Sequence, residues 1–185
     1  MRYALDRPMV SDPGTSMEDS TGTSHILSTI LTRATKKSTH QFAAEVLARP
    51  LGISLERWPR DPQGIYFGGN EMRLTPRDMW KFGELYRNHG EWEGRQIVPA
   101  EWIRTSWQPR TVSRFNGHHY GFGWWIRSSG GHEVYFAWGY GGQYIFIVPE
   151  LELVMVTTSD ASTARSGDHL RAVHLLLDDA VRWAE

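Results

Sequence analysis

The sequence predicts an α+β protein in which several helices are followed by a meander of antiparallel strands and a closing helix. Three observations support this prediction. Apolar residues recur at helical spacing in segments between residues 24 and 107. Four short segments between residues 120 and 158 are rich in β-branched and aromatic residues and are bounded by turn residues. Helical spacing then returns over residues 168–183.

Two helices are expected near the start of the chain, after a Pro-, Ser- and Thr-rich segment that reads as loop. The first runs from about residue 24 to residue 36, with an apolar face made of Ile26, Leu27, Ile30 and Leu31. The second has Thr39 as its N-cap and is stopped by Pro50.

An irregular segment separates this pair from two further helices. Residues 51–73 contain six Gly and Pro residues and no periodic pattern, which predicts a long loop around Trp58, Tyr66 and Phe67. The clearest helix starts at Thr75-Pro76, where a capping hydroxyl precedes a proline at the first helical position. A short helix over residues 98–107 follows it.

The strands are predicted at residues 120–127, 134–138, 143–149 and 151–158. The closing helix carries one apolar stripe that needs a surface to cover, and the sheet is the available surface. We therefore divide one domain into a helical and loop part, residues 1–110, and a part with the strands and the last helix, residues 111–185.

Composition and charge argue against several functions. The 185 residues include 20 basic and 21 acidic side chains without a long run of like charge, so we expect no nucleic-acid partner and no membrane. The absence of cysteine excludes disulfides and thiolate chemistry. The first ten residues lack the apolar segment of a signal peptide, so we expect a cytoplasmic protein.

Two common nucleophile motifs are missing from the sequence. Lysine occurs only at positions 36, 37 and 81, and none of these has a serine three residues earlier, so no S-x-x-K is present. No serine has both of the flanking glycines of a G-x-S-x-G turn.

The histidines allow more than one interpretation. His118-His119 and His132-Glu133 could gather around a metal, but no helical H-x-x-x-H spacing fixes them, so we expect solvated side chains and no metal or other cofactor. His25 could act as a general base, although a core-edge histidine with one hydrogen bond is favoured. His169 and His174 are expected on the surface of the closing helix.

The stretch Gly139-Tyr140-Gly141-Gly142 also has two interpretations. Its glycines could relieve crowding where two strands pass, which is what the local pattern favours. They could instead present backbone N–H groups to a carbonyl oxygen of a ligand.

Taken in order, several segments resemble the carboxy-terminal half of serine β-lactamase-type hydrolases. This group includes class C β-lactamases, penicillin-binding-protein-like esterases and 6-aminohexanoate-dimer hydrolases. The resemblance covers nearly the whole chain, through the order and spacing of PGTSMEDSTGTSHILSTIL (13–31), PLGI (50–53), GGNEMRLTPRDMWKFGELY (68–86), GRQIVPAEWI (94–103), YGFGWW (120–125) and the glycine-containing run 136–160.

The resemblance implies a β-lactamase/transpeptidase-like fold and an acyl-serine reaction on small amide or ester substrates, such as β-lactams, esters or oligoamides. The family's tyrosine motif falls on Asp19-Ser20-Thr21, which places Asp19 where the family usually has tyrosine. The strand that closes the pocket falls on Ala137-Trp138-Gly139. The resemblance therefore implies two catalytic groups, Asp19 and the backbone N–H of Tyr140, which would act as an oxyanion donor. It also implies four substrate-binding residues: Ser20, Trp138, Gly139 and Gly141.

The departures from this pattern lead to further expectations. The S-x-x-K segment and the first strands of the sheet would precede Met1, so we expect an incomplete fold that is inactive alone. An exposed sheet edge and apolar face predict self-association or a complementing amino-terminal chain. Two alternatives remain open: one half of a split hydrolase, or a non-catalytic module that binds peptidoglycan-like or oligoamide ligands through Trp58, Tyr66, Phe67, Trp124, Trp125, Trp138 and Tyr140.

Overall fold

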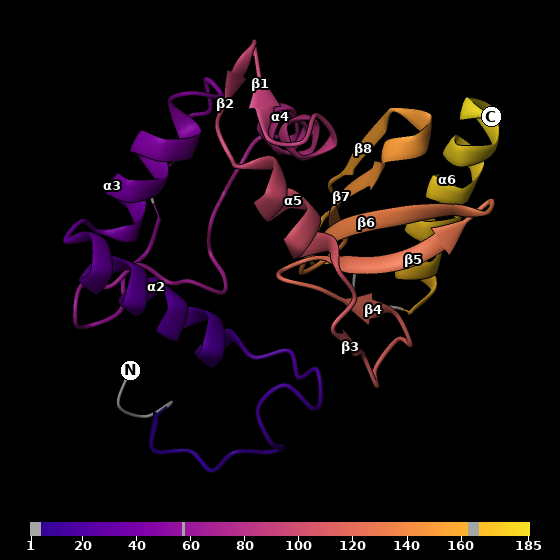
Figure 1. Cartoon of the computed structure of the whole chain (residues 1–185). Helices are drawn as coiled ribbons and strands as arrows, with labels where there is room; N and C mark the ends of the chain where they lie inside the picture. The colour runs from indigo at the N-terminus through magenta and orange to yellow at the C-terminus, as the bar shows by residue number, and fades with distance from the viewer. Residues whose placement is uncertain (1–4, 57, 163–166) are drawn as a thin grey trace. The chain divides into compact units, whose positions relative to one another are not determined.

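The computed structural model describes residues 5–56, 58–162 and 167–185 and confirms the α+β class (Figure 1). Its internal contacts divide the chain into two compact units, Met1–Thr75 and Pro76–Glu185, which we call unit 1 and unit 2. The division lies before the helix that starts at Pro76, so the two helices expected over residues 75–107 belong to the same unit as the strands. In the described ranges, no helix is both long and apolar enough to cross a membrane.

Unit 1 contains α2 (Thr21–Thr35), α3 (Thr39–Ala43) and a π-helical turn, η1 (Ala44–Ala48). The first helix starts three residues earlier than predicted because the Ser20 hydroxyl accepts a hydrogen bond from the backbone N–H of Thr23 and caps it. The predicted cap of the second helix was wrong. Ser38 is the N-cap, in a capping box with Gln41, while Thr39 is the first helical residue and is buried.

The long loop of unit 1 packs directly onto α2. A Cβ atom at Gly68 would lie 2.2 Å from the carbonyl oxygen of Ser24, and one at Gly69 would lie 3.0 Å from the Cα of Thr21. The Ser28 hydroxyl also donates a 2.7 Å hydrogen bond to the carbonyl oxygen of Tyr66. Glycines are therefore required here for close approach of the loop to the first turns of the helix.

Unit 2 contains a six-stranded antiparallel sheet whose strand order follows the chain order. The strands are β3 (Thr111–Val112), β4 (His119–Tyr120), β5 (Trp125–Ser129), β6 (His132–Gly139), β7 (Gln143–Val148) and β8 (Leu153–Thr157). A separate hairpin consists of β1 (Glu91–Trp92) and β2 (Arg95–Gln96). The strand predicted over residues 120–127 is interrupted between Tyr120 and Trp125, where Gly123 adopts a φ of 84°.

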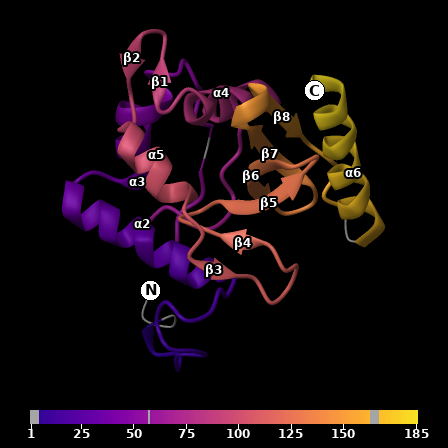
Figure 2. The same cartoon turned by 45° about the vertical axis from the view of Figure 1, so that its right-hand side comes forward.

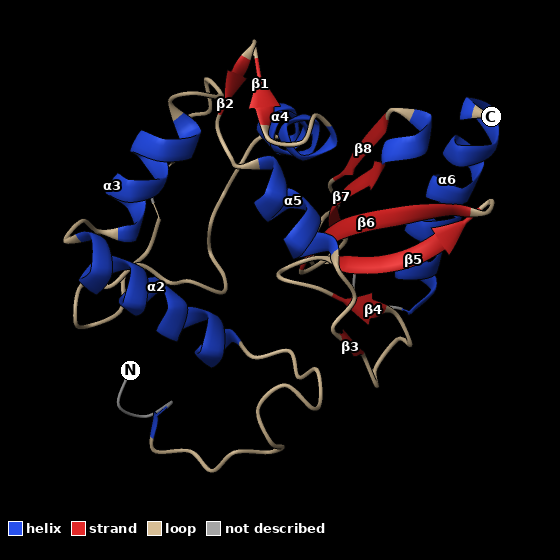
Figure 3. Cartoon of the chain, in the orientation of Figure 1, coloured by secondary structure: helices blue, strands red, loops and turns tan. Residues whose placement is uncertain are grey.

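Helices cover both faces of this sheet (Figures 2 and 3). On one face, α4 (Pro76–Arg87) and α5 (Ala100–Trp107) form a core with Trp124, which precedes β5, and with side chains of β7 and β8. The core residues besides Trp124 are Tyr86, Ile103, Trp107, Ile145, Ile147, Val154 and Val156. On the other face, α6 (Gly167–Ala184) places His174 within 5.4–5.5 Å of the rings of Phe136, Tyr144 and Phe146. The predicted cover of the sheet by the closing helix is confirmed.

Candidate functional site

The six residues expected at the site fall into two sets. Asp19 and Ser20 lie in unit 1, and Trp138, Gly139, Tyr140 and Gly141 lie in unit 2. Asp19 is exposed and directly precedes Ser20, the N-cap of α2. The Ser20 hydroxyl lies 3.2 Å from the backbone N of Thr23 and 3.1 Å from its Oγ1, so its orientation is fixed by the first helical turn.

A buried His–Asp pair holds the loop of unit 1 against this end of α2. The Nε2 atom of His25 lies 3.0 Å from Oδ2 of Asp61, and both residues are 9% exposed. The other carboxylate oxygen of Asp61 accepts hydrogen bonds from the backbone N–H groups of Gln63 and Ile65, each at 2.9 Å. The structural interpretation of His25, a core-edge histidine with one hydrogen bond, is confirmed.

Opposing effects act on the pKa of Asp61. Burial raises it, but the hydrogen bonds from His25 and from the backbone N–H groups of Ile65 and Gln63 outweigh that effect, and the net pKa is lowered. The Nδ1 atom of His25 is buried and has no hydrogen-bond partner among the described residues. The pair fixes the backbone of the loop against α2.

In unit 2 the glycines form the turn of the β6–β7 hairpin. Gly139 ends β6 and pairs with Gln143, the first residue of β7. Between them, Gly141 and Gly142 adopt φ angles of 80° and 87°, which side chains rarely allow. Tyr140 is 67% exposed at the tip. The glycines thus have a structural role in the turn. That they also present backbone N–H groups to a ligand stays a prediction.

The end of β8 and the segment that follows it hold this turn in place. The side-chain amide of Gln143 donates a 2.6 Å hydrogen bond to the carbonyl oxygen of Ser159, and the Thr157 hydroxyl donates to that of Gly142 at 3.1 Å. A Cβ atom at Gly142 would lie 2.6 Å from Nε2 of His169. Gln143 was not expected as a positioning residue because its partner is sixteen residues away, and no local pattern reveals such a pair.

Trp138 lies at the aromatic end of the same hairpin. Its ring stacks on that of Tyr144, with the ring centroids 5.9 Å apart. Its centroid also lies 5.7 Å from that of Trp125 and 6.3 Å from that of Phe115. Burial raises the pKa of Tyr144 to about 12, so this phenol stays protonated at neutral pH. Trp138 therefore packs in a cluster of aromatic rings that carries no charge at neutral pH.

The expectation that His174 is a surface residue was wrong. It packs among three aromatic rings, and burial, followed by the nearby positive charge of Arg127, lowers its pKa to about 4. His118 lies 5.9 Å from it, measured between ring centroids, and is half-buried rather than solvated. His132 pairs instead with Glu150 at 2.6 Å. Over the described ranges, no cluster of three or more metal-ligating side chains occurs.

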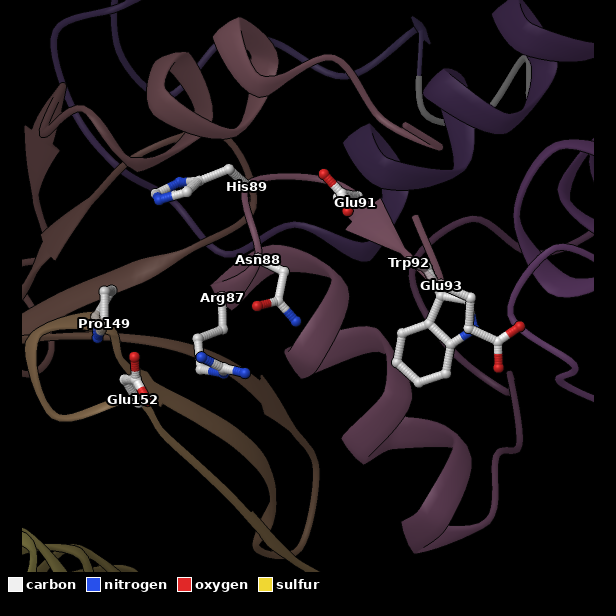
Figure 4. A pocket seen from close by; sticks show the side chains of 8 residues that line it. All are labelled: Arg87, Asn88, His89, Glu91, Trp92, Glu93, Pro149 and Glu152. Carbon is white, nitrogen blue, oxygen red and sulfur yellow. The ribbon is translucent and has the colours of Figure 1, made fainter. Parts of the chain in front are cut away.

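A hollow of about 700 Å³ lies elsewhere in unit 2 (Figure 4). It is lined by Arg87, Asn88, His89, Glu91, Trp92, Glu93, Pro149 and Glu152. Pro149 and Glu152 belong to the turn between β7 and β8, which places this hollow at the opposite end of β7 from Gly142. The Arg87 guanidinium already pairs with Glu84 at 2.8 Å. The hollow is therefore separate from the predicted acyl site.

Comparison with known proteins identifies the family. The family model described as Beta-lactamase matches residues 1–178, so the chain belongs to the beta-lactamase family. No curated protein sequence matches the chain significantly.

Solved structures share the fold. A Bacillus anthracis protein that carries the name of a 6-aminohexanoate-dimer hydrolase has a TM-score of 0.82 at 23% identity and matches 98% of this chain. A beta-lactamase from Mycobacterium bovis gives 0.72 at 18% identity over 94% of this chain. EstCE1, described as a hydrolase with promiscuous acyltransferase activity, has a TM-score of 0.72 at 16% identity and matches 93% of this chain. The chain spans 47%, 66% and 58% of these three proteins, respectively.

Proposed function

We propose that this chain forms one side of the acyl pocket of a serine hydrolase for small amide or ester substrates, and that it does not turn them over by itself. The observation that carries this proposal is the combination of a fixed glycine hairpin at Trp138–Gly142 with a sequence that contains no S-x-x-K. The family match over residues 1–178 supports the hydrolase class.

The roles proposed for the site residues follow from the family resemblance. The backbone N–H of Tyr140 would stabilise the oxyanion that forms when a carbonyl carbon is attacked, and the Trp138 ring would form an apolar wall beside the acyl group. Asp19 would introduce a negative charge where charge of the same sign develops, which opposes acylation. The hydroxyl of Ser20, fixed by Thr23, would orient the substrate.

A hydrolysis assay on the purified chain tests this proposal. Nitrocefin and p-nitrophenyl acetate should be hydrolysed no faster than by a heat-inactivated sample of the same protein. A saturable rate above that background, lost in a Trp138→Ala variant, would show that the chain is active alone and would overturn the claim of inactivity.

The outer strand β8 favours a second candidate function, one half of a two-part hydrolase. β8 is the last strand in the sheet order, and its backbone edge faces away from β7 along the apolar segment Leu153–Thr157. It carries no charge or proline of the kind that protects natural sheet edges. We propose that a strand of a complementing chain, one that also supplies the nucleophile, pairs along this edge.

Co-expression tests the second candidate. The part of the Bacillus anthracis protein that this chain does not cover is the natural trial partner. Expected results are co-purification, slower hydrogen exchange of the β8 amides and the appearance of ester hydrolysis. Co-expression without co-purification, or with unchanged exchange at β8, would contradict the proposed pairing.

A further inference from the structure

A second cavity, in unit 1, has the chemistry of a binding site and plays no part in the proposed acyl pocket. Its volume is about 400 Å³, and it is lined by His40, Trp58, Pro59, Arg60 and Tyr66. Cavities of this size suit small organic molecules. The lining combines three aromatic rings with the guanidinium of Arg60, and its described residues include no carboxylate.

The rings form a fixed platform. His40 stacks on Tyr66 with centroids 5.3 Å apart, and the Trp58 ring lies 5.7 Å from that of Tyr66. Tyr66 itself is buried, at 8% exposure, and its carbonyl oxygen accepts a hydrogen bond from Ser28 of α2. The platform is thereby attached to the helix, and ligand binding would need little reordering of the loop.

The guanidinium of Arg60 is held over this platform. Its Cζ lies 4.4 Å from the centroid of the Tyr66 ring, and Nη2 donates a 2.5 Å hydrogen bond to the Tyr66 hydroxyl. Only one of its N–H groups is used in this way, and the residues that the structure describes provide no carboxylate for the others. A planar, pre-oriented guanidinium with open donors is the group that binds carboxylates through two parallel hydrogen bonds.

Further donors in the same lining also lack acceptors. The Nε1–H of Trp58 is buried and has no hydrogen-bond partner within the described part of the chain. The Tyr66 hydroxyl, which accepts from Arg60, keeps its own proton available for donation. Buried polar groups are nearly always hydrogen-bonded in folded proteins, so the orphan indole N–H of a residue that lines the cavity is a candidate donor to a bound acceptor.

We propose that this cavity binds a small organic carboxylate with a flat apolar body. The carboxylate oxygens accept hydrogen bonds from Arg60 and from the orphan donors, and the apolar body lies against the aromatic rings. The inference does not depend on the acyl pocket, because every residue that carries it lies in unit 1.

Proton–nitrogen NMR of the purified full chain tests the proposal, with benzoate as the probe. A Trp58→Phe variant identifies the Trp58 signal among the nine tryptophan indole N–H resonances. Titration with benzoate should move that signal saturably, whereas benzamide, which has the same shape without the charge, should bind at least about tenfold more weakly. A Trp58 signal that is unmoved by benzoate at tens of millimolar would overturn the proposal.

Two charge-removing variants complete the test. Arg60→Met should weaken benzoate binding at least about tenfold. Arg73→Met removes an equal charge from the surface of the same unit and should bind benzoate like the unmodified chain. Equal effects of the two variants would show attraction by net charge alone and would contradict a built site. Saturation-transfer signals of benzoate give the same comparison even if the Trp58→Phe variant fails to fold.

Discussion

Single side chains in this protein derive their roles from partners that are distant in the sequence. Asp61 is one case, since it joins the loop of unit 1 to His25 of α2, 36 residues earlier. Its neighbour Pro62 and the following Gly64 suggest only a turn. The sequence could therefore predict the loop but not the carboxylate that fixes it.

Removal of the Asp61 carboxylate should destabilise unit 1. Asp61→Ala leaves Nε2 of His25 and two backbone N–H groups without their acceptor, which should lower the free energy of unfolding by about 1–3 kcal/mol. Because the folded pKa of Asp61 is lowered, its contribution is present above pH 3.8 and is lost as the pH falls further. Urea denaturation at pH 7 measures the loss, and the exposed Asp19→Ala serves as the control, with a change within about 0.5 kcal/mol. Equal stability of the two variants would contradict the role of Asp61.

His174 should make the stability of unit 2 depend on pH over a higher range, from about 4 to 6.5. Its folded pKa of about 4 lies below the ordinary value of 6.5, so the unfolded chain binds more protons between these values. The free energy of unfolding should therefore fall as the pH is lowered from about 6.5 to about 4. His118, Arg127 and Asp178 surround the same ring, and the pKa of His118 is also lowered by burial and by Arg127.

A His174→Phe variant separates this contribution from the others. The ring is retained but cannot titrate, so the fall in stability between pH 6.5 and 4 should be smaller than in the unmodified protein. His119→Phe, at an exposed position of β4, should leave the fall unchanged. Denaturant midpoints at half-unit pH intervals give the comparison, and parallel curves for His174→Phe and the unmodified protein would contradict the assignment.

At the scale of elements, the glycine hairpin between β6 and β7 combines two requirements. Gly142 needs a φ of 87° and also close approach to His169 and Ser159. Gly131, in the turn between β5 and β6, has a φ of 88° but has no atom within 4 Å of an added Cβ. The two positions share the backbone requirement and differ in the packing requirement.

Alanine at each position should separate these effects. Gly131→Ala should cost about 1 kcal/mol, the usual cost of placing a side chain at positive φ. Gly142→Ala should cost about 1–3 kcal/mol more, because its Cβ would lie 2.6 Å from the His169 ring. Thermal unfolding of both variants checks the difference. Equal losses would mean that α6 and the segment after β8 do not constrain the turn.

Helix α4 meets the sheet at a position where only glycine fits. A Cβ at Gly83 would lie 2.6 Å from Cγ1 of Val154 and 2.9 Å from Cγ2 of Ile145. Gly83→Ala should therefore lower the free energy of unfolding by about 1–2 kcal/mol, although alanine is the better helix former by about 1 kcal/mol. A Val154→Ala background removes the nearer methyl group and should reduce that cost. If Gly83→Ala raises the melting temperature, the close packing of α4 on β8 is not present.

The elements themselves were largely predictable because their signals are local. The Thr75-Pro76 start of α4 and the β-branched and aromatic residues of β6 and β7 appear directly in the sequence, and the structure confirms these elements. The interruption between β4 and β5 was missed because β propensity continues through Trp124. The environment of His174 was also missed, since the three rings that surround it belong to two strands, β6 and β7, that are distant in sequence from α6. The predicted site residues were located, but no local signal shows what they bind.

For the whole molecule, the outer surface of α6 predicts association. Leu175 and Leu176 are 53% and 55% exposed, and Trp183, one heptad after Leu176, is 91% exposed. Exposed apolar stripes of this kind usually contact another surface. Together with the open edge of β8, they lead us to expect self-association of the isolated chain.

Size-exclusion chromatography with light scattering tests this expectation. The unmodified chain should show an apparent mass that rises with concentration. Leu176→Glu should shift it toward the monomer mass of 21.2 kDa. Arg171→Gln, which changes the net charge by the same amount at an exposed position of the same helix, should leave the association intact. A chain that is monomeric at all concentrations would contradict the prediction.

The agreement between strand order and chain order in the sheet of unit 2 has a kinetic consequence. Every strand from β4 to β8 pairs with the strand just before it, so each pairing closes only a short loop. The sheet therefore has low contact order for a β structure and can form hairpin by hairpin, in the order of synthesis. β8 would be the last strand added, so a growing sheet of this kind always presents its newest strand as the edge where the next one binds.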